Sequence, residues 1–186
     1  MKIRPITPED SDAVATLVNA SYSGFDPEFR MVGRRVQTGE RIHAAIVQRG
    51  ERGVVAESDD GGQLLGVSLW RPYGDPVKAS HLHLLFVHPD QNRKGLGGEL
   101  ISRHWEQSKA DWPEVGIFTL NVLKGSYWAL PFYAKQGYRV YQEGDEGSVP
   151  HLSTYFRGPH PPGRQPPEPY FILHYQPAGD VPQKTA

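Results

Sequence analysis

Residues 81–98 read HLHLLFVHPDQNRKGLGG and hold two sets of chemically capable groups, three imidazoles and a basic, glycine-rich turn. The apolar run predicts a buried strand, and a helical pattern follows the turn from about Gly97. Amide N–H groups at a helix N-terminus have no partner within the helix and carry the positive end of its dipole, so they bind anions. Glycine lets the backbone approach such an anion without a Cβ atom in the way. The stretch therefore predicts a phosphate or pyrophosphate site.

The glycine spacing in this turn excludes two common phosphate-binding motifs. A dinucleotide fingerprint needs a third glycine where this chain has Leu100, and a nucleoside-triphosphate loop needs a Gly-Lys-Ser/Thr sequence that the turn lacks. The motif that remains is Val87-x-Pro89 followed by Arg93-Lys94-Gly95-Leu96-Gly97-Gly98. It resembles the acetyl-CoA-binding motif of the GNAT superfamily of N-acyltransferases. The alternative is a glycine turn without a ligand, because such turns are frequent in α/β domains.

A second stretch resembles a later part of the same family. Leu120-Asn121-Val122, followed by the sequence ALPFYAKQGY at residues 129–138, is similar to the family's late strand, its next helix and its FYxKxGF signature. Two matches in the right order favour the resemblance over coincidence. It implies an α/β (α+β), GNAT-like acyl-CoA N-acyltransferase fold, with a central mixed, twisted sheet of six to seven strands flanked by about four helices.

The resemblance also implies which residues hold acetyl-CoA, the acyl donor. They lie at the end of the strand, in the basic turn and at one later hydroxyl: Leu85, Phe86, Val87, Asn92, Arg93, Lys94, Gly95, Leu96, Gly97, Gly98 and Ser126. Two of them depart from the family pattern, because Asn92 stands where Gln or Arg is usual and Ser126 where many members have Asn. The backbone cradle at residues 93–98 depends on neither side chain.

Transfer of an acyl group to an amine poses two proton problems. The ammonium form, with a pKa of about 10, must lose a proton before it can attack, and the departing thiolate needs one. A neutral imidazole can accept the proton of the amine directly or through water. Strand alternation predicts one face with His81, His83, Leu85 and Val87 and a second face with Leu82, Leu84 and Phe86.

The run His-x-His-x-Leu-x-Val-His is similar to the strand of arylalkylamine N-acetyltransferases in which two histidines remove the proton. His81 and His83 fall on those positions, and the same resemblance places Tyr133 where a tyrosine protonates the coenzyme A thiolate. The structural alternatives are a hydrogen-bonded histidine pair at a sheet end and packing of Tyr133 beside Phe132. A metal site that adds His88 is disfavoured, since His88 alternates to the opposite face and no carboxylate cluster is nearby, so no metal is expected.

The elements that must position these groups follow from periodicity and turn chemistry. The Asp-Gly-Gly sequence at 60–62 predicts a hairpin turn, and alternating strands and helices in the second half indicate parallel pairing there. Ala13, Leu17 and Ala20 are expected to form the apolar face of the first helix, and Gly137 to end the last helix with a positive φ angle. Strands are expected over residues 2–7, 53–57, 64–70, 81–87, 117–122, 138–141 and 170–175, and helices over 8–20, up to about 48, over 97–110 and over 127–136.

One domain is expected over residues 1–176, with a proline-rich insertion at about 143–169, and residues 177–186 are expected to form a polar tail. Insertions of this length are usually functional or disordered, and in GNAT enzymes this connection borders the acceptor site. The acceptor is expected to meet aromatic residues of two loops: Tyr22, Phe25, Phe29, Tyr155 and Phe156. They favour an apolar or aromatic amine over a polyamine, for which the sequence offers no acidic cluster.

Composition bounds the remaining function classes. The chain has 186 residues, no cysteine and a formal net charge of −1, so disulfides, a thiol nucleophile and nucleic-acid binding through bulk charge are not expected. No apolar run reaches membrane-spanning length and the N-terminus lacks a signal-peptide core, so a cytoplasmic protein without membrane contact is expected, and a homodimer is compatible with the sequence. We predict an acetyl-CoA-dependent N-acetyltransferase that acetylates a primary amine of a small molecule by direct transfer. The alternatives are a peptide or protein N-acetyltransferase and a non-catalytic acyl-CoA-binding module.

Overall fold

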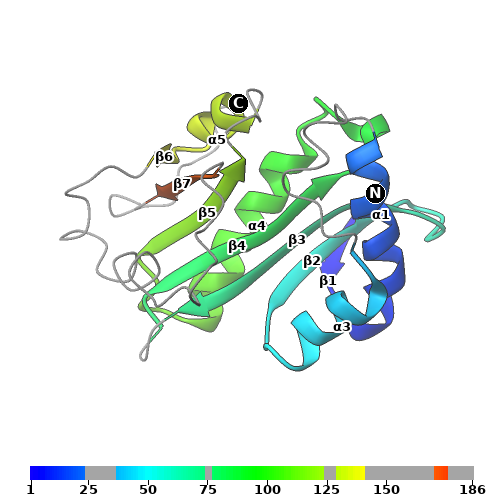
Figure 1. Cartoon of the computed structure of the whole chain (residues 1–186), viewed down its shortest axis with the longest axis horizontal. Helices are drawn as coiled ribbons and strands as arrows, with labels where there is room; N and C mark the ends of the chain where they lie inside the picture. Colours follow the sequence, from blue (N-terminus) through cyan, green and yellow to red (C-terminus); the bar gives the residue numbers. More distant parts are fainter. Residues whose placement is uncertain (24–36, 74–76, 124–128, 141–169, 176–186) are drawn as a thin grey trace, which may run out of the picture.

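The structure, a computed structural model, describes residues 1–23, 37–73, 77–123 and 129–140, and the backbone of residues 170–175. Its centre is a mixed seven-stranded sheet with the order β1-β2-β3-β4-β5-β7-β6 (Figure 1). This confirms the expected mixed sheet. The strands are β1 (Lys2–Pro5), β2 (Arg52–Glu57), β3 (Leu64–Tyr73), β4 (Ala79–Val87), β5 (Ile117–Leu123), β6 (Arg139–Val140) and β7 (Tyr170–Tyr175).

Strand directions follow the chain connections. Strands β1 to β4 pair antiparallel in sequence order, and the β2–β3 hairpin turns at Gly61, whose φ angle of 69° is one that glycine adopts readily. Strands β4 and β5 are parallel because the helix between them returns the chain to the end of the sheet at which β4 begins. The predicted hairpin and the parallel pairing in the second half are both confirmed.

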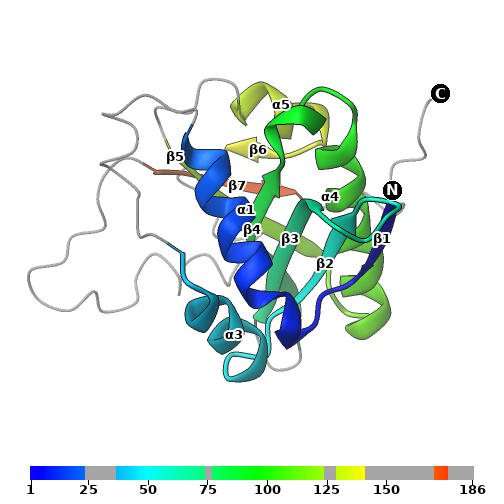
Figure 2. The ribbon, with the colours of Figure 1, turned by 90° about the vertical axis from the view of Figure 1, so that its right-hand side faces the viewer.

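Four α-helices in the described part of the chain cover the two faces of the sheet: α1 (Ser11–Ser23), α3 (Gly39–Val47), α4 (Leu96–Asp111) and α5 (Ala129–Lys135). Figure 2 shows α1 and α3 on one face and α4 and α5 on the other. The expected start at Pro8 forms a short 3-10 turn, Pro8–Asp10, that leads into α1. Gly137 follows α5 with a φ angle of 86°, as predicted.

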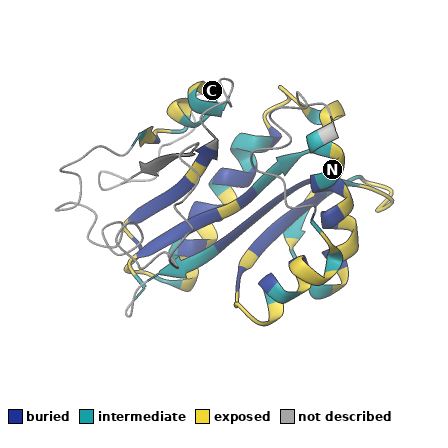
Figure 3. Ribbon diagram, in the orientation of Figure 1, coloured by how far each residue is buried: buried dark blue, intermediate teal, exposed yellow. Residues whose placement is uncertain are grey.

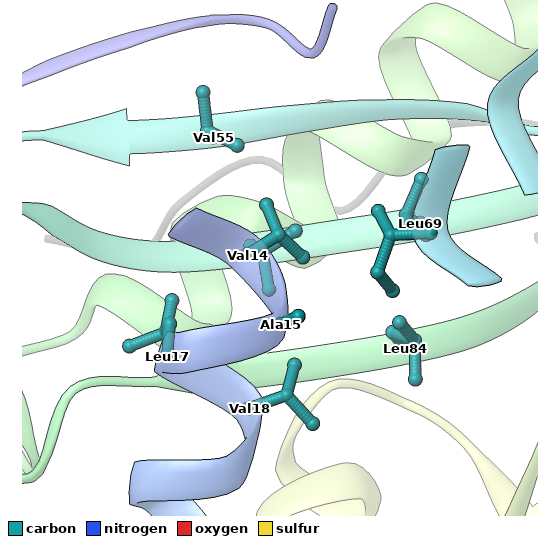
Figure 4. Packing of buried hydrophobic residues seen from close by; sticks show 9 residues of the cluster. Val14, Ala15, Leu17, Val18, Val55, Leu69 and Leu84 are labelled. Carbon is teal, nitrogen blue, oxygen red and sulfur yellow. The ribbon is translucent and has the colours of Figure 1, made fainter. Parts of the chain in front are cut away.

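The buried side chains form a core layer on each side of the sheet, and the middle parts of the central strands are buried (Figure 3). Under α1, Val14 and Val18 pack on Leu69 and Leu84 of the sheet (Figure 4). The apolar face expected for this helix is wrong for Ala13 and Ala20, which are exposed, and right only for Leu17. The buried stripe starts one residue later, at Val14, because the larger β-branched side chains take the core positions.

Strand β4 carries a β-bulge at His83. Leu69 pairs with Leu84, but its neighbour Trp70 pairs with Leu82, so His83 is an extra residue in the ladder. The extra residue reverses the alternation of side chains. Leu84 joins the core under α1, whereas Leu82 joins the core under α4. The prediction that Leu82 shares a face with Leu84 and Phe86 is therefore wrong. The companion prediction, that His81 and His83 share a face with Leu85 and Val87, is wrong for the same reason, since Leu85 and Val87 pack toward α4.

Strands β4 and β5 separate just beyond this bulge. Their registered pairs run from Ala79–Ile117 to Leu82–Leu120, and no described residue further along either strand pairs across. Both strands nevertheless continue, β4 to Val87 and β5 to Leu123, and the N-terminus of α4 follows the end of β4. The sheet thus opens between two strands beside a helix N-terminus. No helix in the described residues combines the length and the apolar composition of a membrane span.

Candidate active site

The turn before α4 presents backbone donors. Gly95 is the N-cap of the helix, with a φ angle of 88°. The first backbone hydrogen bond of the helix runs from the amide of Glu99 to the carbonyl of Gly95, at 3.1 Å. The amides of the first turn have no acceptor within the helix. Arg93, with a φ angle of 62°, and the exposed Lys94 precede them. This arrangement of amides and positive charge lies where the sequence analysis expects a pyrophosphate to bind.

The glycines at 97 and 98 also have a packing role that the sequence did not reveal. A Cβ atom at Gly97 would lie 3.1 Å from the Phe132 ring, and one at Gly98 would lie 3.4 Å from the amide of Gln136. Both neighbours belong to α5 or to the turn that follows it. The glycines therefore let α5 pack close to the N-terminus of α4, at the cradle.

The strand residues predicted to hold the donor lie on both faces of β4. Leu85 and Val87 pack toward α4, and Phe86 faces α1, where its ring meets the edge of Tyr22 at a centroid distance of 5.1 Å. Asn92 is exposed beside the cradle. The remaining predicted residues lie outside the described part of the chain, namely Ser126 for the donor and Phe25, Phe29, Tyr155 and Phe156 for the acceptor.

His83 is bound by a buried carboxylate. Its Nδ1–H donates to Oε2 of Glu51 at 2.7 Å, and Arg49 donates to the other oxygen of Glu51 at 3.0 Å. A neutral imidazole protonated at Nδ1 carries its lone pair on Nε2, so this nitrogen is the proton acceptor. The His83 side chain is 40% exposed, whereas that of Glu51 is fully covered. The pair therefore presents an oriented base toward solvent.

Glu51 stays ionised in this position. Burial alone would raise the pKa of its carboxyl, but the hydrogen bond and charge of His83, with those of Arg49, outweigh burial and hold the pKa below its usual value. Sequence reasoning missed Glu51, which is 32 residues from His83. The only local signal is a carboxylate placed just before an apolar strand.

His81 lies on the same face but is buried. Its Nδ1 is hydrogen-bonded to the Thr119 hydroxyl at 2.8 Å, and its ring meets the ring of Tyr73 edge-on at 5.9 Å. Burial, with the positive charge of Arg71 and His83, lowers the pKa of His81 to about 3. Of the two predicted histidines, His81 is thus held neutral inside the protein and His83 is accessible.

Tyr133 lies on the opposite face, in α5. Its ring packs against Phe132 at 5.0 Å and Tyr138 at 5.8 Å, and burial raises its pKa, so it keeps its proton. Its hydroxyl has no hydrogen-bond partner among the described residues. The Tyr138 hydroxyl, by contrast, accepts a bond from the Trp105 indole at 3.1 Å. Tyr133 therefore offers a proton that the described fold does not use.

His88 takes no part in this group. Its Nδ1 accepts a bond from the Asp90 amide at 3.3 Å in the turn after β4, and its Nε2 contacts the Gln63 amide at 3.1 Å. Within the described residues, no three His, Cys, Asp or Glu side chains gather as a metal ion would require.

Comparison with known proteins shows which family and which solved structures the chain is similar to. Residues 49–140 match the family model described as an acetyltransferase (GNAT) domain. No curated protein sequence matches the chain at a significant level. The fold is similar to solved structures at low sequence identity. For the PaiA N-acetyltransferase from Thermoplasma acidophilum, in complex with coenzyme A, the identity is 17%, the TM-score is 0.65, and 95% of this chain and 99% of that chain are covered.

Two further structures show the same fold. The ribosomal-protein-alanine N-acetyltransferase from Brucella melitensis is 15% identical, with a TM-score of 0.65 over 95% of this chain and 99% of that one. An acetyltransferase from Streptococcus agalactiae is also 15% identical, with a TM-score of 0.65 over 94% of this chain and 97% of that one.

Proposed function

Because residues 49–140 form an acetyltransferase domain of the GNAT family, whose acyl donor is acetyl-CoA, we propose that the protein acetylates a primary amine of a small molecule by direct transfer. One observation carries this proposal. An oriented base, His83, and a protonated tyrosine, Tyr133, lie on opposite faces of the sheet beside the opening between β4 and β5. An acyl group in that opening can be approached by an amine from one face and lose its leaving group toward the other.

The donor end of the site consists of backbone and positive charge. The amides at the start of α4, with Arg93 and Lys94, suit a pyrophosphate, and the unpaired edge of β4 at Leu85–Val87 suits the amide groups of a pantetheine chain. Ser126 remains a predicted contact. This part binds and orients the donor, and the reactive thioester belongs to acetyl-CoA itself.

His83 is the proposed general base. Its Nδ1–H is held by Glu51, so the free Nε2 accepts a proton from the ammonium group of the acceptor, directly or through one water molecule. As the imidazole becomes charged, the buried carboxylate stabilises it. His81, deeper on the same face, is the proposed neighbour that orders this region through Thr119 and remains neutral.

Tyr133 is the proposed general acid. Its pKa is raised by burial, so it is protonated when the thiolate leaves and donates that proton to sulfur. No covalent enzyme intermediate is required, because the base and the acid complete the two proton transfers in one ternary complex.

A peptide or protein N-terminus is the second candidate acceptor. The exposure of His83 favours it, since a base that solvent reaches is also open to the end of a chain. The Brucella melitensis relative in fold is named for such a substrate.

The test is coenzyme A release from acetyl-CoA with a panel of aromatic amines, amino acids, polyamines and peptides. The intact protein is compared with His83→Gln and Tyr133→Phe. Saturable turnover of one amine class, reduced at least about 100-fold in both variants, supports the proposal. Turnover that survives both substitutions overturns the residue roles. Tight acetyl-CoA binding without turnover of any acceptor favours the non-catalytic binding module instead.

A further inference from the structure

Arg71 lies beside the two histidines on the acceptor side of the sheet. Its Cα is registered directly opposite that of His81, and the adjacent Trp70 packs into the core under α4, so Arg71 projects from the face that carries His81. The guanidinium carbon of Arg71 lies 4.8 Å from the centroid of the Tyr73 ring. That ring in turn contacts His81. Arg71, Tyr73 and His81 therefore form one cluster, referred to below as the Arg71 cluster.

Among the described residues, no carboxylate pairs with the cation in this cluster. Arg71 is half-buried, and its Nε is fully covered without a hydrogen-bond partner among these residues. Other arginines behave differently: Arg4 binds Asp10 at 2.8 Å, and Arg49 binds Glu51 at 3.0 Å. A partly buried charge is costly unless it is paired, and the ring of Tyr73 offsets only part of that cost. The cluster thus has a positive site that the described fold leaves unused.

The distance to the proposed base suits a small molecule. His83 lies in the bulge between the Trp70–Leu82 and Leu69–Leu84 pairs, so its Cα lies roughly 7 Å from that of Arg71, from about one and a half strand rises and one strand spacing. The charges of Arg71 and His83 both act on His81, so both groups lie within electrostatic reach of it. A molecule with its amine at His83 can therefore bring a second group within reach of the long Arg71 side chain.

We propose that Arg71 binds a carboxylate of the acceptor, so that the substrate class is an amine that also carries a carboxylate, such as a free amino acid. This inference rests on the proposed function, since it names the acceptor of the same site. Guanidinium is planar and matches a carboxylate with two parallel hydrogen bonds. The same positive charge disfavours polyamines, which would bring a second cation to the Arg71 cluster.

The experiment compares matched pairs of acceptors that differ only in the carboxylate, phenylalanine with phenethylamine and 4-aminobutyrate with butylamine. The carboxylate member of a reactive pair is expected to show a kcat/KM at least about 10-fold higher. In Arg71→Met this advantage should fall to within about twofold, mainly through KM, and Arg71→Lys should restore part of it. Arg52→Met is the control, because Arg52 lies on the neighbouring strand with a highly exposed side chain, and it should retain the full advantage.

A binding measurement separates this inference from the proposed function. Calorimetry with coenzyme A present compares N-acetylphenylalanine with N-phenethylacetamide, in the intact protein and in Arg71→Met. An Arg71-dependent preference for the acid supports the anion site even if no amine is acetylated, in which case only the proposed function fails. Two results overturn the anion site: equal kcat/KM values for the two members of each pair, or a loss of kcat/KM in Arg71→Met that is the same for both members. The proposed function stands in either case, because the intact protein still acetylates an amine. Failure of both readouts overturns both.

Discussion

The Nδ1 atom of His83 lies 2.7 Å from Oε2 of Glu51, a carboxylate whose side chain is fully covered. The pair joins a bulged residue of β4 to a residue that precedes β2, and it leaves the second nitrogen of the partly exposed His83 side chain without a hydrogen bond from the described residues. Such an arrangement fixes the tautomer of an imidazole and stabilises its charged form. Most of the mechanism proposed above depends on this contact.

Glu51→Gln should slow the chemical step. The amide keeps the shape of the side chain but not its charge, so the imidazolium formed during proton removal loses its stabilising partner, and kcat is expected to fall about 10- to 100-fold with the KM for acetyl-CoA unchanged. Steady-state kinetics check this. Glu57→Gln is the matched control, since Glu57 pairs with Arg4 away from the site. Equal rates in both variants would remove Glu51 from the mechanism.

The two histidines should respond in opposite ways. His83→Gln keeps a donor for Glu51 but removes the base, so kcat should drop about 100- to 10,000-fold with little change in the free energy of unfolding. His81→Asn removes a buried group bonded to Thr119, so the free energy of unfolding should fall by about 1–3 kcal/mol while kcat changes less. Kinetics and urea unfolding of both variants provide the comparison, and the reverse ranking would assign the base to His81.

Tyr133→Phe and Tyr138→Phe form a second pair. The first removes a hydroxyl without a described partner, so it should reduce kcat by about 100-fold or more and leave stability nearly unchanged. The second leaves the buried Trp105 indole without its acceptor and should cost about 1–3 kcal/mol of stability with normal kinetics. A parent-like kcat for Tyr133→Phe across the pH range would exclude it as the acid.

Gly95→Ala should weaken coenzyme A binding. The φ angle of 88° is costly for alanine by about 1–2 kcal/mol, so the turn is expected to relax and move the amides of the cradle. Gly61→Ala carries a similar backbone cost at the β2–β3 turn, where φ is 69°, and should leave the Kd for coenzyme A unchanged. Calorimetric titration of both variants measures the difference, and equal Kd values would separate the cradle from the cofactor.

Stability should decline as the solution becomes acidic. Burial, the largest cause, lowers the pKa of both His81 and His104 to about 3. The unfolded chain binds protons at these residues below about pH 6.5, whereas the native protein does not. The contribution of these neutral histidines to the free energy of unfolding is therefore fully present above about pH 6.5 and is lost as the pH falls toward 3. The expected slope is about 1.4 kcal/mol per pH unit for each histidine. Urea unfolding at several pH values measures it, and His104→Gln should reduce the slope by one proton.

Much of this fold was predictable because its signals are local. The Asp-Gly-Gly turn, the glycine-rich cradle before Leu96 and the positive φ angle at Gly137 depend on a few neighbouring residues, and all appear where the sequence placed them. His83 was also named from its own strand. These features need no knowledge of the partner across the sheet.

The missed features depend on contacts between distant residues. Glu51 reaches His83 only because β2, β3 and β4 lie side by side, and the packing role of Gly97 becomes visible only once Phe132 is placed above it. The face assignment of Leu82 failed for the same reason. A bulge is a mismatch between two strands, and the sequence of one strand does not contain it.

The bulge makes His83 a residue that the strand ladder does not require, because the pairs on either side of it, Trp70–Leu82 and Leu69–Leu84, are consecutive on β3. Loss of this single codon would restore an uninterrupted ladder and leave every later residue of the strand on its present side. Leu84 and Phe86 would still pack under α1, and Leu85 and Val87 would still pack toward α4, so both cores would be kept and only the imidazole would be lost. During divergence, this strand can therefore gain or lose its accessible imidazole by insertion or deletion of one residue, without a change in the residues that form the two cores.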